Sequence, residues 1–145
     1  MGLPSGTYRI SCLANQKMVG LRFDDLMNTG DPIKQIYASD DIDPTWKFEE
    51  LGDGRYIIKT SNMGNVLAGE RDHALCAFGG GFPVGMGNNG PCEWAVEEAD
   101  PSGGVYKIHK VDSQEGWMVQ GDRQVSIGFP NDTDEEKFMI IPTME

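Results

Sequence analysis

The sequence predicts an all-β protein built from three copies of one four-strand unit. Three observations carry this prediction: a tyrosine motif recurs three times, an aromatic motif closes each copy, and turn residues separate the copies. Internal repeats are sought first because missing one would lead to the wrong fold.

The tyrosine motif opens each copy as a glycine, a tyrosine two residues later and an isoleucine two residues after that. The three copies of this motif occupy residues 6–10, 54–58 and 104–108. Tyr8, Tyr56 and Tyr106 are therefore 48 and 50 residues apart. Tyr8 and Ile10 alternate with polar residues, which is the pattern of a half-buried strand. Cys12 continues this parity and is expected to face the core.

An aromatic motif marks the last strand of each copy. Trp46 and Trp94 open it in the first two copies, each 38 residues after the tyrosine, and Phe138 opens it 32 residues after the third tyrosine. Between the two motifs, an apolar residue stands 11 residues after each tyrosine: Val19, Leu67 and Trp117. Three coincident markers in three copies indicate a true repeat.

Each copy offers about four short strands by its alternation and turn signals. No window shows a sustained helical face with a cap, so long helices are not expected. Three such units predict a β-trefoil with pseudo-threefold symmetry, a six-strand barrel closed at one end by three hairpins, whereas a propeller needs at least about four blades. We expect one domain over residues 1–145, with repeats of approximately 1–50, 51–102 and 103–145. Surface loops are expected at residues 40–43, 111–115 and 129–136.

The charge of the chain argues against two classes of partner. Acidic residues outnumber basic ones by 23 to 12, for a net charge of −11, whereas nucleic acids and anionic membranes attract basic faces. No apolar stretch approaches about 18 residues, so no transmembrane helix is expected. The first residues lack the pattern of a signal peptide, and three cysteines are an odd number, so we expect a cytoplasmic protein with reduced thiols. No exposed apolar stripe argues against a monomer.

The sequence predicts neither a cofactor nor a metal site. Residues 85–90 fit G-x-G-x-x-G, but the prolines and the tryptophan around them indicate neighbouring strands, not the strand and helix of a dinucleotide site. Cys12, Cys76, Cys92 and His73 lack the paired spacing of zinc ligands. Buried free thiols are the preferred interpretation of these cysteines.

Catalysis is not expected either. Of the two histidines, His73 lies in a predicted loop, and His109 has the parity opposite to Ile108, so it should face solvent. No set of nucleophile, base and orienting group stands out. A binding module is therefore preferred over an enzyme.

Short motifs over nearly the whole chain resemble the mushroom β-trefoil serine protease inhibitors. These motifs are mostly core and turn positions: Gly6-x-Tyr8-x-Ile10, Thr45-Trp46, Gly52-Asp53-Gly54-x-Tyr56-Ile57, His73-Ala74-Leu75, Trp94-x-Val96-Glu97, Tyr106-x-Ile108 and Gly116-Trp117. The resemblance implies a fungal cytoplasmic defence protein that inhibits serine proteases of the trypsin/chymotrypsin type.

The resemblance also implies a protease-binding loop between the second and third strands of the first copy, at residues 22–32. Its central residues are Asp24, Asp25, Leu26, Met27, Asn28 and Thr29. A trypsin inhibitor offers Arg or Lys to an acidic S1 pocket, but the middle of this loop offers Leu26 or Met27. We therefore expect the target to be a serine protease with an apolar S1 pocket.

Several alternatives stay open. Arg22 at the start of the loop and Arg71 in another loop are secondary candidates for a trypsin-like pocket. Asn62, or the glycine-rich residues 79–90, would suit a cysteine protease inhibitor of the mushroom trefoil type. A ricin-B-like lectin usually carries Gln-x-Trp on the last strand of each copy, and that glutamine is absent in all three copies. The loop at residues 22–32 is also open to interpretation as a surface connection with no target, since loops vary freely.

Overall fold

This computed structural model describes most of the strands and leaves several connections undescribed. The described residues are 3–14, 16–22, 33–39, 42–43, 45–60, 67–71, 74–78, 90–91, 93–100, 104–111, 114–119, 124–129 and 134–143. Of these residues, positions 22, 33, 43, 71, 90, 91, 100 and 134 are described by their backbone alone.

The described residues form strands and one short 3-10 helix, as the all-β prediction requires. The first third of the chain contains β1 (Gly6–Cys12), β2 (Met18–Arg22), β3 (Ile33–Gln35), β4 (Tyr37–Ser39), β5 (Ile42–Asp43) and β6 (Thr45–Gly52). The second third contains β7 (Arg55–Thr60), β8 (Leu67–Arg71), β9 (Ala74–Phe78), β10 (Gly90–Pro91) and β11 (Trp94–Asp100). The last third contains β12 (Val105–Lys110), β13 (Gly116–Val119), β14 (Val125–Gly128), the 3-10 helix η1 (Asp134–Glu136) and β15 (Phe138–Pro142).

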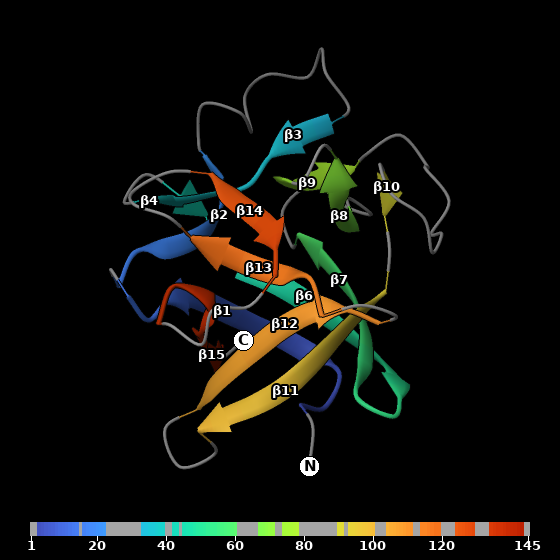
Figure 1. Ribbon diagram of the computed structural model, residues 1–145. Helices are drawn as coiled ribbons and strands as arrows, with labels where there is room; N and C mark the ends of the chain where they lie inside the picture. The colour runs from blue at the N-terminus through green and yellow to red at the C-terminus, as the bar shows by residue number, and fades with distance from the viewer. Residues whose placement is uncertain are drawn as a thin grey trace.

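Six strands close a ring in which each strand pairs with the next. The order around the ring is β1, β6, β7, β11, β12 and β15, and β15 pairs back onto β1. Three further antiparallel pairs, β2 with β4, β8 with β9 and β13 with β14, follow the first strand of each copy. Figure 1 shows the long β6, β11 and β12 crossing below these shorter strands. A six-strand ring with three hairpin-like pairs is the arrangement that the predicted β-trefoil requires.

The strand registers show which residues of the three copies are equivalent. Ser11 pairs with Met18 in the first copy, Lys59 with Leu67 in the second and His109 with Gly116 in the third. The residues that follow Met18, Leu67 and Gly116 are therefore equivalent too, so Ala68 is the residue of the second copy that corresponds to Val19 and Trp117. The sequence match of Leu67 with Val19 is thus wrong by one residue, because the second copy has one more residue between its first two strands.

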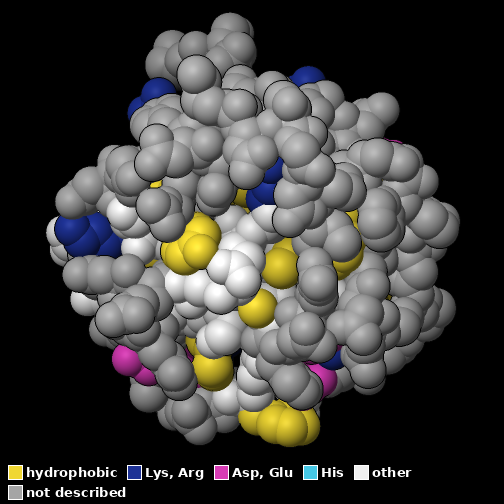
Figure 2. Space-filling view, turned by 90° about the horizontal axis from the view of Figure 1, so that it is seen from above, with side chains coloured by type: hydrophobic (Ala, Val, Ile, Leu, Met, Phe, Trp, Pro, Cys, Tyr) yellow, Lys and Arg dark blue, Asp and Glu magenta, His cyan; other side chains and the backbone are white. Residues whose placement is uncertain are grey.

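Aromatic side chains fill the centre of the ring, as predicted. Trp46, Trp94 and Phe138 are each 0% exposed, and Trp117 is 1% exposed. The ring centroid of Trp117 lies 6.0 Å, 5.6 Å and 6.0 Å from those of Trp46, Trp94 and Phe138. Burying aromatic residues of this size supplies the main stabilisation of a small domain, about 2–3 kcal/mol each. Seen from above, described hydrophobic side chains are visible near the centre of this end of the molecule (Figure 2).

Tyrosines surround the core at the position of the tyrosine motif. The hydroxyl groups of Tyr8 and Tyr56 donate hydrogen bonds of 2.6 Å to the carbonyl oxygens of Pro4 and Leu3. Tyr8 and Tyr56 are buried, whereas Tyr106 is half-buried. The N-terminal segment thus satisfies two buried hydroxyl groups in the first two copies.

Several smaller predictions have clear outcomes. Cys12 and Cys76 are buried, as predicted, and Cys92 lies outside the described residues. The expected surface loop at residues 40–43 is wrong in its second half, because Ile42 is 4% exposed and forms β5 against β2. The expected loop at residues 129–136 contains η1 at its end. Among the described residues, no helix is long and apolar enough to cross a membrane.

Candidate functional site

The predicted protease-binding loop falls in a part of the chain whose structure is not described. Asp24, Asp25, Leu26, Met27, Asn28 and Thr29 all lie outside the described residues. The two segments that carry this loop, β2 before it and β3 after it, are described, and they define how the loop is anchored.

The segment before the loop is held by two strands. Val19 and Gly20 of β2 pair with Ala38 and Tyr37 of β4, and the last two residues of β2 pair with β5. Leu21 is 1% exposed, so the residue just before Arg22 is fixed in the core. The backbone of Arg22 is therefore set by its pairing with β5, while the position of its side chain is not described.

The segment after the loop is held by the other two copies. Residues of β3 pair with β9 of the second copy. Just beyond β3, the amide of Ile36 donates to the carbonyl oxygen of Leu75 at 3.0 Å, and the carbonyl oxygen of Ile36 accepts from the amide of Val125 at 2.9 Å. Ile36 is 0% exposed. The chain leaves the loop at a point where all three copies are joined by backbone hydrogen bonds.

The first copy is also unlike the other two in the length of this connection. Fourteen residues separate Arg22, the end of β2, from Tyr37, the start of its partner β4. Two residues separate β8 from β9, and five separate β13 from β14. The first copy therefore carries an insertion that contains β3 and residues 23–32. Long connections in a compact domain are commonly functional.

The secondary candidates are only partly located. Arg71 is the last residue of β8, and its backbone pairs with Ala74 of β9 in a tight hairpin, but its side chain is not described. Asn62 and most of residues 79–90 lie outside the described residues. These candidates therefore stay predictions.

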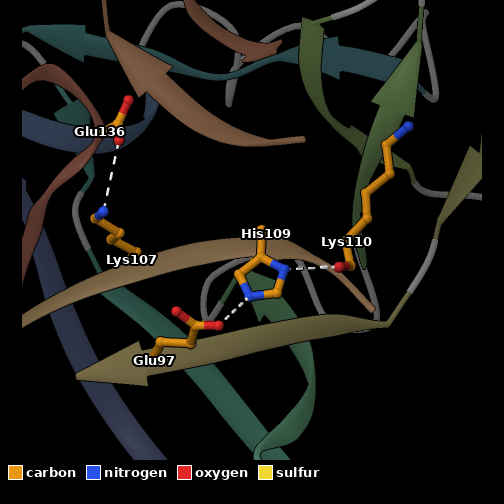
Figure 3. Close-up of polar contacts among 5 residues, drawn as sticks. All are labelled: Glu97, Lys107, His109, Lys110 and Glu136. Atoms are coloured by element: carbon orange, nitrogen blue, oxygen red, sulfur yellow. Dashed lines mark hydrogen bonds and ion pairs between the residues drawn. The ribbon is translucent and has the colours of Figure 1, made fainter. Parts of the chain in front are cut away.

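A group of polar side chains that the sequence interpretation did not single out lies on the third copy (Figure 3). His109 Nε2 lies 2.9 Å from Glu97 Oε1, and His109 Nδ1 lies 2.8 Å from the carbonyl oxygen of Lys110. Lys107 Nζ lies 3.6 Å from Glu136 Oε1. The expectation that His109 faces solvent needs correction, because its side chain is only 21% exposed and both ring nitrogens have partners. The signal that could have identified this group is the pairing of Glu97 with Lys107 across two adjacent strands, since opposite charges attract at such positions.

A second ionic group joins the second and third copies. Lys110 Nζ forms an ion pair with Glu70 and lies 3.1 Å from Glu115 Oε1. The Glu70 side chain is 3% exposed and that of Lys110 is 16% exposed. Burial lowers the pKa of Lys110, but the hydrogen bonds and charges of Glu70 and Glu115 outweigh it and raise the pKa above 10.5. The charge of Lys110 is therefore firmly maintained.

The described residues do not offer a metal centre. No group of three or more His, Cys, Asp or Glu side chains in the described part of the chain is arranged to hold a metal ion. The polar groups of the third copy are instead the Lys107–Glu136 ion pair and the hydrogen bond between His109 and Glu97, an arrangement suited to binding a polar ligand.

Comparison with known proteins adds a family and a fold. A family model described as peptidase inhibitor I66 matches residues 1–136, and no curated protein matches the chain. A proteinase inhibitor from Coprinopsis cinerea has a similar structure, with a TM-score of 0.77 and 19% identity over 98% of this chain and 100% of that chain.

Two other solved structures are similar over almost the full chain. The designed threefold symmetric protein ThreeFoil has a TM-score of 0.72 and 14% identity, over 95% of this chain and 99% of that chain. A ricin B-like lectin from Macrolepiota procera, solved in complex with lactose, has a TM-score of 0.72 and 13% identity, over 99% of both chains. At these identities the likeness shows a shared fold.

Proposed function

Because this chain belongs to the peptidase inhibitor I66 family, we propose that it inhibits serine endopeptidases by presenting residues 23–32 to the protease active site. Membership of this family makes the chain an inhibitor and not an enzyme. The observation that carries the choice of loop is the insertion of the first copy, which is anchored on either side by strand pairing.

The anchoring of the loop supports a mechanism of tight ground-state binding. A free peptide loses conformational freedom when it enters an active site, and this loss weakens its binding. Here β5 holds one end of the insertion, and β9 and Val125 hold the region after the other end. In the proposed mechanism the scaffold restricts the loop before the protease arrives, so less freedom is lost on binding.

We propose Leu26 or Met27 as the residue that enters the S1 pocket. Both are apolar, so the proposed targets are chymotrypsin-, elastase- or subtilisin-like enzymes and not trypsin. Asp24 and Asp25 precede these residues in a chain of net charge −11. A protease with a basic rim around its active site is therefore the better electrostatic match.

We also propose that the protein acts as a cytoplasmic monomer in fungal defence. The odd number of cysteines, of which Cys12 and Cys76 are buried, supports a reducing compartment. Size-exclusion chromatography with light scattering measures the oligomeric state, and a dimer would contradict this part of the proposal.

The decisive experiment is an inhibition panel of chymotrypsin, elastase, subtilisin, trypsin and papain. We expect inhibition of at least one of the first three enzymes and its loss in the double variant Leu26→Gly/Met27→Gly. The matched control is Arg71→Gly, which alters a secondary candidate in another hairpin and should leave that inhibition unchanged.

Other outcomes assign the function differently. Inhibition of trypsin alone that disappears in Arg71→Gly would move the site to the β8–β9 hairpin. Inhibition of papain alone would favour the cysteine protease alternative and Asn62. Full potency of the double variant toward chymotrypsin would refute the role of Leu26 and Met27.

A further inference from the structure

A pocket lies on the outside of the third copy, apart from the insertion of the first copy. It has a volume of about 180 Å³ and is lined by residues of β11, β12, β13, β14 and η1. The polar groups of Figure 3 stand around it: Glu97, Lys107, His109 and Glu136. Met118, which is 8% exposed, gives it an apolar wall, whereas the side chains of Ile108 and Trp117 are buried in the core.

Two glycines distinguish this copy at the position of the pocket. Gly116 and Gly128 face each other across β13 and β14 and both line the pocket. The equivalent pair in the second copy is Leu67 and Phe78. A Cβ at Gly116 would clash with the carbonyl oxygen of Ile108 and lie 2.9 Å from the Cβ of His109, and one at Gly128 would lie 3.2 Å from Met118 Sδ. The side chains missing from these positions would therefore point toward groups that line the pocket.

The equivalent surface of the first copy has a different chemistry. By strand register, Arg9 corresponds to Lys107, Ser11 to His109 and Met18 to Gly116. A groove there is lined by these residues and by the half-exposed Ile141, and no carboxylate lines it. The polar lining of the third-copy pocket is thus absent from the corresponding groove of the first copy.

Donors and acceptors stand side by side around the pocket of the third copy. Lys107 forms an ion pair with Glu136, and His109 Nε2 lies within hydrogen-bond distance of Glu97. With one lysine and two glutamates in its lining, the pocket does not favour an anionic ligand. A hydroxyl group both donates and accepts, so it can use a carboxylate and an ammonium or imidazole group together. Glu97 is well placed for this, since its side chain is 62% exposed.

The size and the walls limit the ligand further. The volume corresponds to about six water molecules and is below the range of about 300–1,000 Å³ typical of drug-sized ligands. A single ring fits such a space better than an extended chain. Met118 would contact the C–H groups of the ring, and the polar rim would contact its hydroxyl groups.

From these observations we propose that the pocket of the third copy binds a single neutral saccharide residue. Glu97 and Lys107 would contact its hydroxyl groups, and Met118 would contact one face of the ring. This binding is separate from protease inhibition and involves none of the residues of the first-copy insertion.

The test is a nuclear magnetic resonance titration of the ¹⁵N-labelled protein with methyl glycosides of galactose, glucose, mannose and N-acetylglucosamine, with glycerol as a simpler polyol. We expect at least one glycoside to bind with a dissociation constant of roughly 1 mM. Binding should shift the amide signals of Gly116 and Gly128 and leave those of Val19 and Gly20, on the first copy, in place.

Two variants test the role of the pocket. Glu97→Gln keeps the shape of the side chain and should weaken binding roughly tenfold, the usual effect of losing a hydrogen bond to a charged group. Its matched control is Glu49→Gln, because Glu49 pairs with Lys59 at 3.2 Å in the equivalent hairpin of the second copy and does not line the pocket. Gly128→Phe introduces the residue of the second copy and should abolish binding.

Three results would overturn the proposal. The amide signals of Gly116 and Gly128 would not shift with any glycoside, or glycerol would bind as strongly as any glycoside. The third is that Glu97→Gln and Glu49→Gln weaken binding equally. If Gly128→Phe does not fold, the comparison of Glu97→Gln with Glu49→Gln decides alone. No protease takes part in the titration, so its failure leaves the proposed inhibition untouched.

Discussion

Replacing Lys110 by methionine should destabilise the protein strongly, because it removes the cation that neutralises a buried carboxylate. The Glu70 side chain is 3% exposed, and Lys110 forms its ion pair from the neighbouring copy. Glu115 lies 3.1 Å from the same ammonium group. The substitution therefore leaves two carboxylates near each other without the charge that holds them together.

The magnitude follows from the burial of the three groups. Removing one partner of a buried ion pair costs about 3–5 kcal/mol. The side chains of Lys110 and Glu115 are 16% and 20% exposed, so water screens part of the interaction and the lower end applies. We expect a loss of about 3 kcal/mol. With a urea m-value of about 2 kcal/mol/M, the unfolding midpoint should fall by about 1.5 M.

The repeat itself supplies a compensating variant. The positions equivalent to Glu70 and Lys110 are Leu21 in the first copy and Thr60 in the second. The double variant Glu70→Leu/Lys110→Thr removes both charges, and replacing a whole buried pair by uncharged residues is often nearly neutral. We expect its stability to lie within about 1 kcal/mol of the parent protein.

Urea unfolding followed by the fluorescence of the buried tryptophans measures these differences. Glu115→Gln is the matched control and should cost less than about 1 kcal/mol, since the cation and its buried partner remain. A midpoint for Lys110→Met within about 0.5 M of the parent would refute the reasoning. So would a double variant as unstable as the single one.

Two further predictions concern the tyrosine positions and the third copy. Burial raises the pKa of three tyrosines above 10.0: Tyr8, Tyr56 and Tyr106. Above about pH 10 the unfolded chain loses these protons while the folded protein keeps them, so urea midpoints should fall between about pH 9 and pH 11, and a constant midpoint would contradict this. Gly116→Ala should lower the free energy of unfolding by about 1–3 kcal/mol, because its Cβ would clash with Ile108 O and His109 Cβ. Gly6→Ala, whose Cβ has no neighbour closer than 3.7 Å, is its control in the same unfolding assay.

The repeated core could be predicted from the sequence because burial imposes the same residue types on all copies. Tyr8, Trp46 and Trp94 recur at fixed spacings, and all three are buried. The register of the second copy could not be predicted correctly, because one extra residue lies between its first two strands. Spacing alone therefore identified Leu67 as the equivalent of Val19. The strand pairing shows that Ala68 is the equivalent residue.

The polar site of the third copy was hidden for a different reason. Alternation places His109 opposite to the core, but it does not say whether a neighbouring strand covers an outward side chain. Glu97 on β11 covers it here, so His109 is only 21% exposed. Glycines without side chains at two facing positions also leave no signal in a pattern of apolar residues.

The three copies of this protein can be compared with one another, and a feature that one copy has and another lacks is not needed by every copy of the repeat. Fourteen residues join β2 to β4, against two and five in the other copies, so the fold does not need the insertion at residues 23–32. The facing pair Gly116 and Gly128 also differs from the second copy, which carries Leu67 and Phe78 there. The insertion and the glycine pair are therefore where binding functions should be sought, and protease and saccharide titrations should show no competition because the two features belong to different copies.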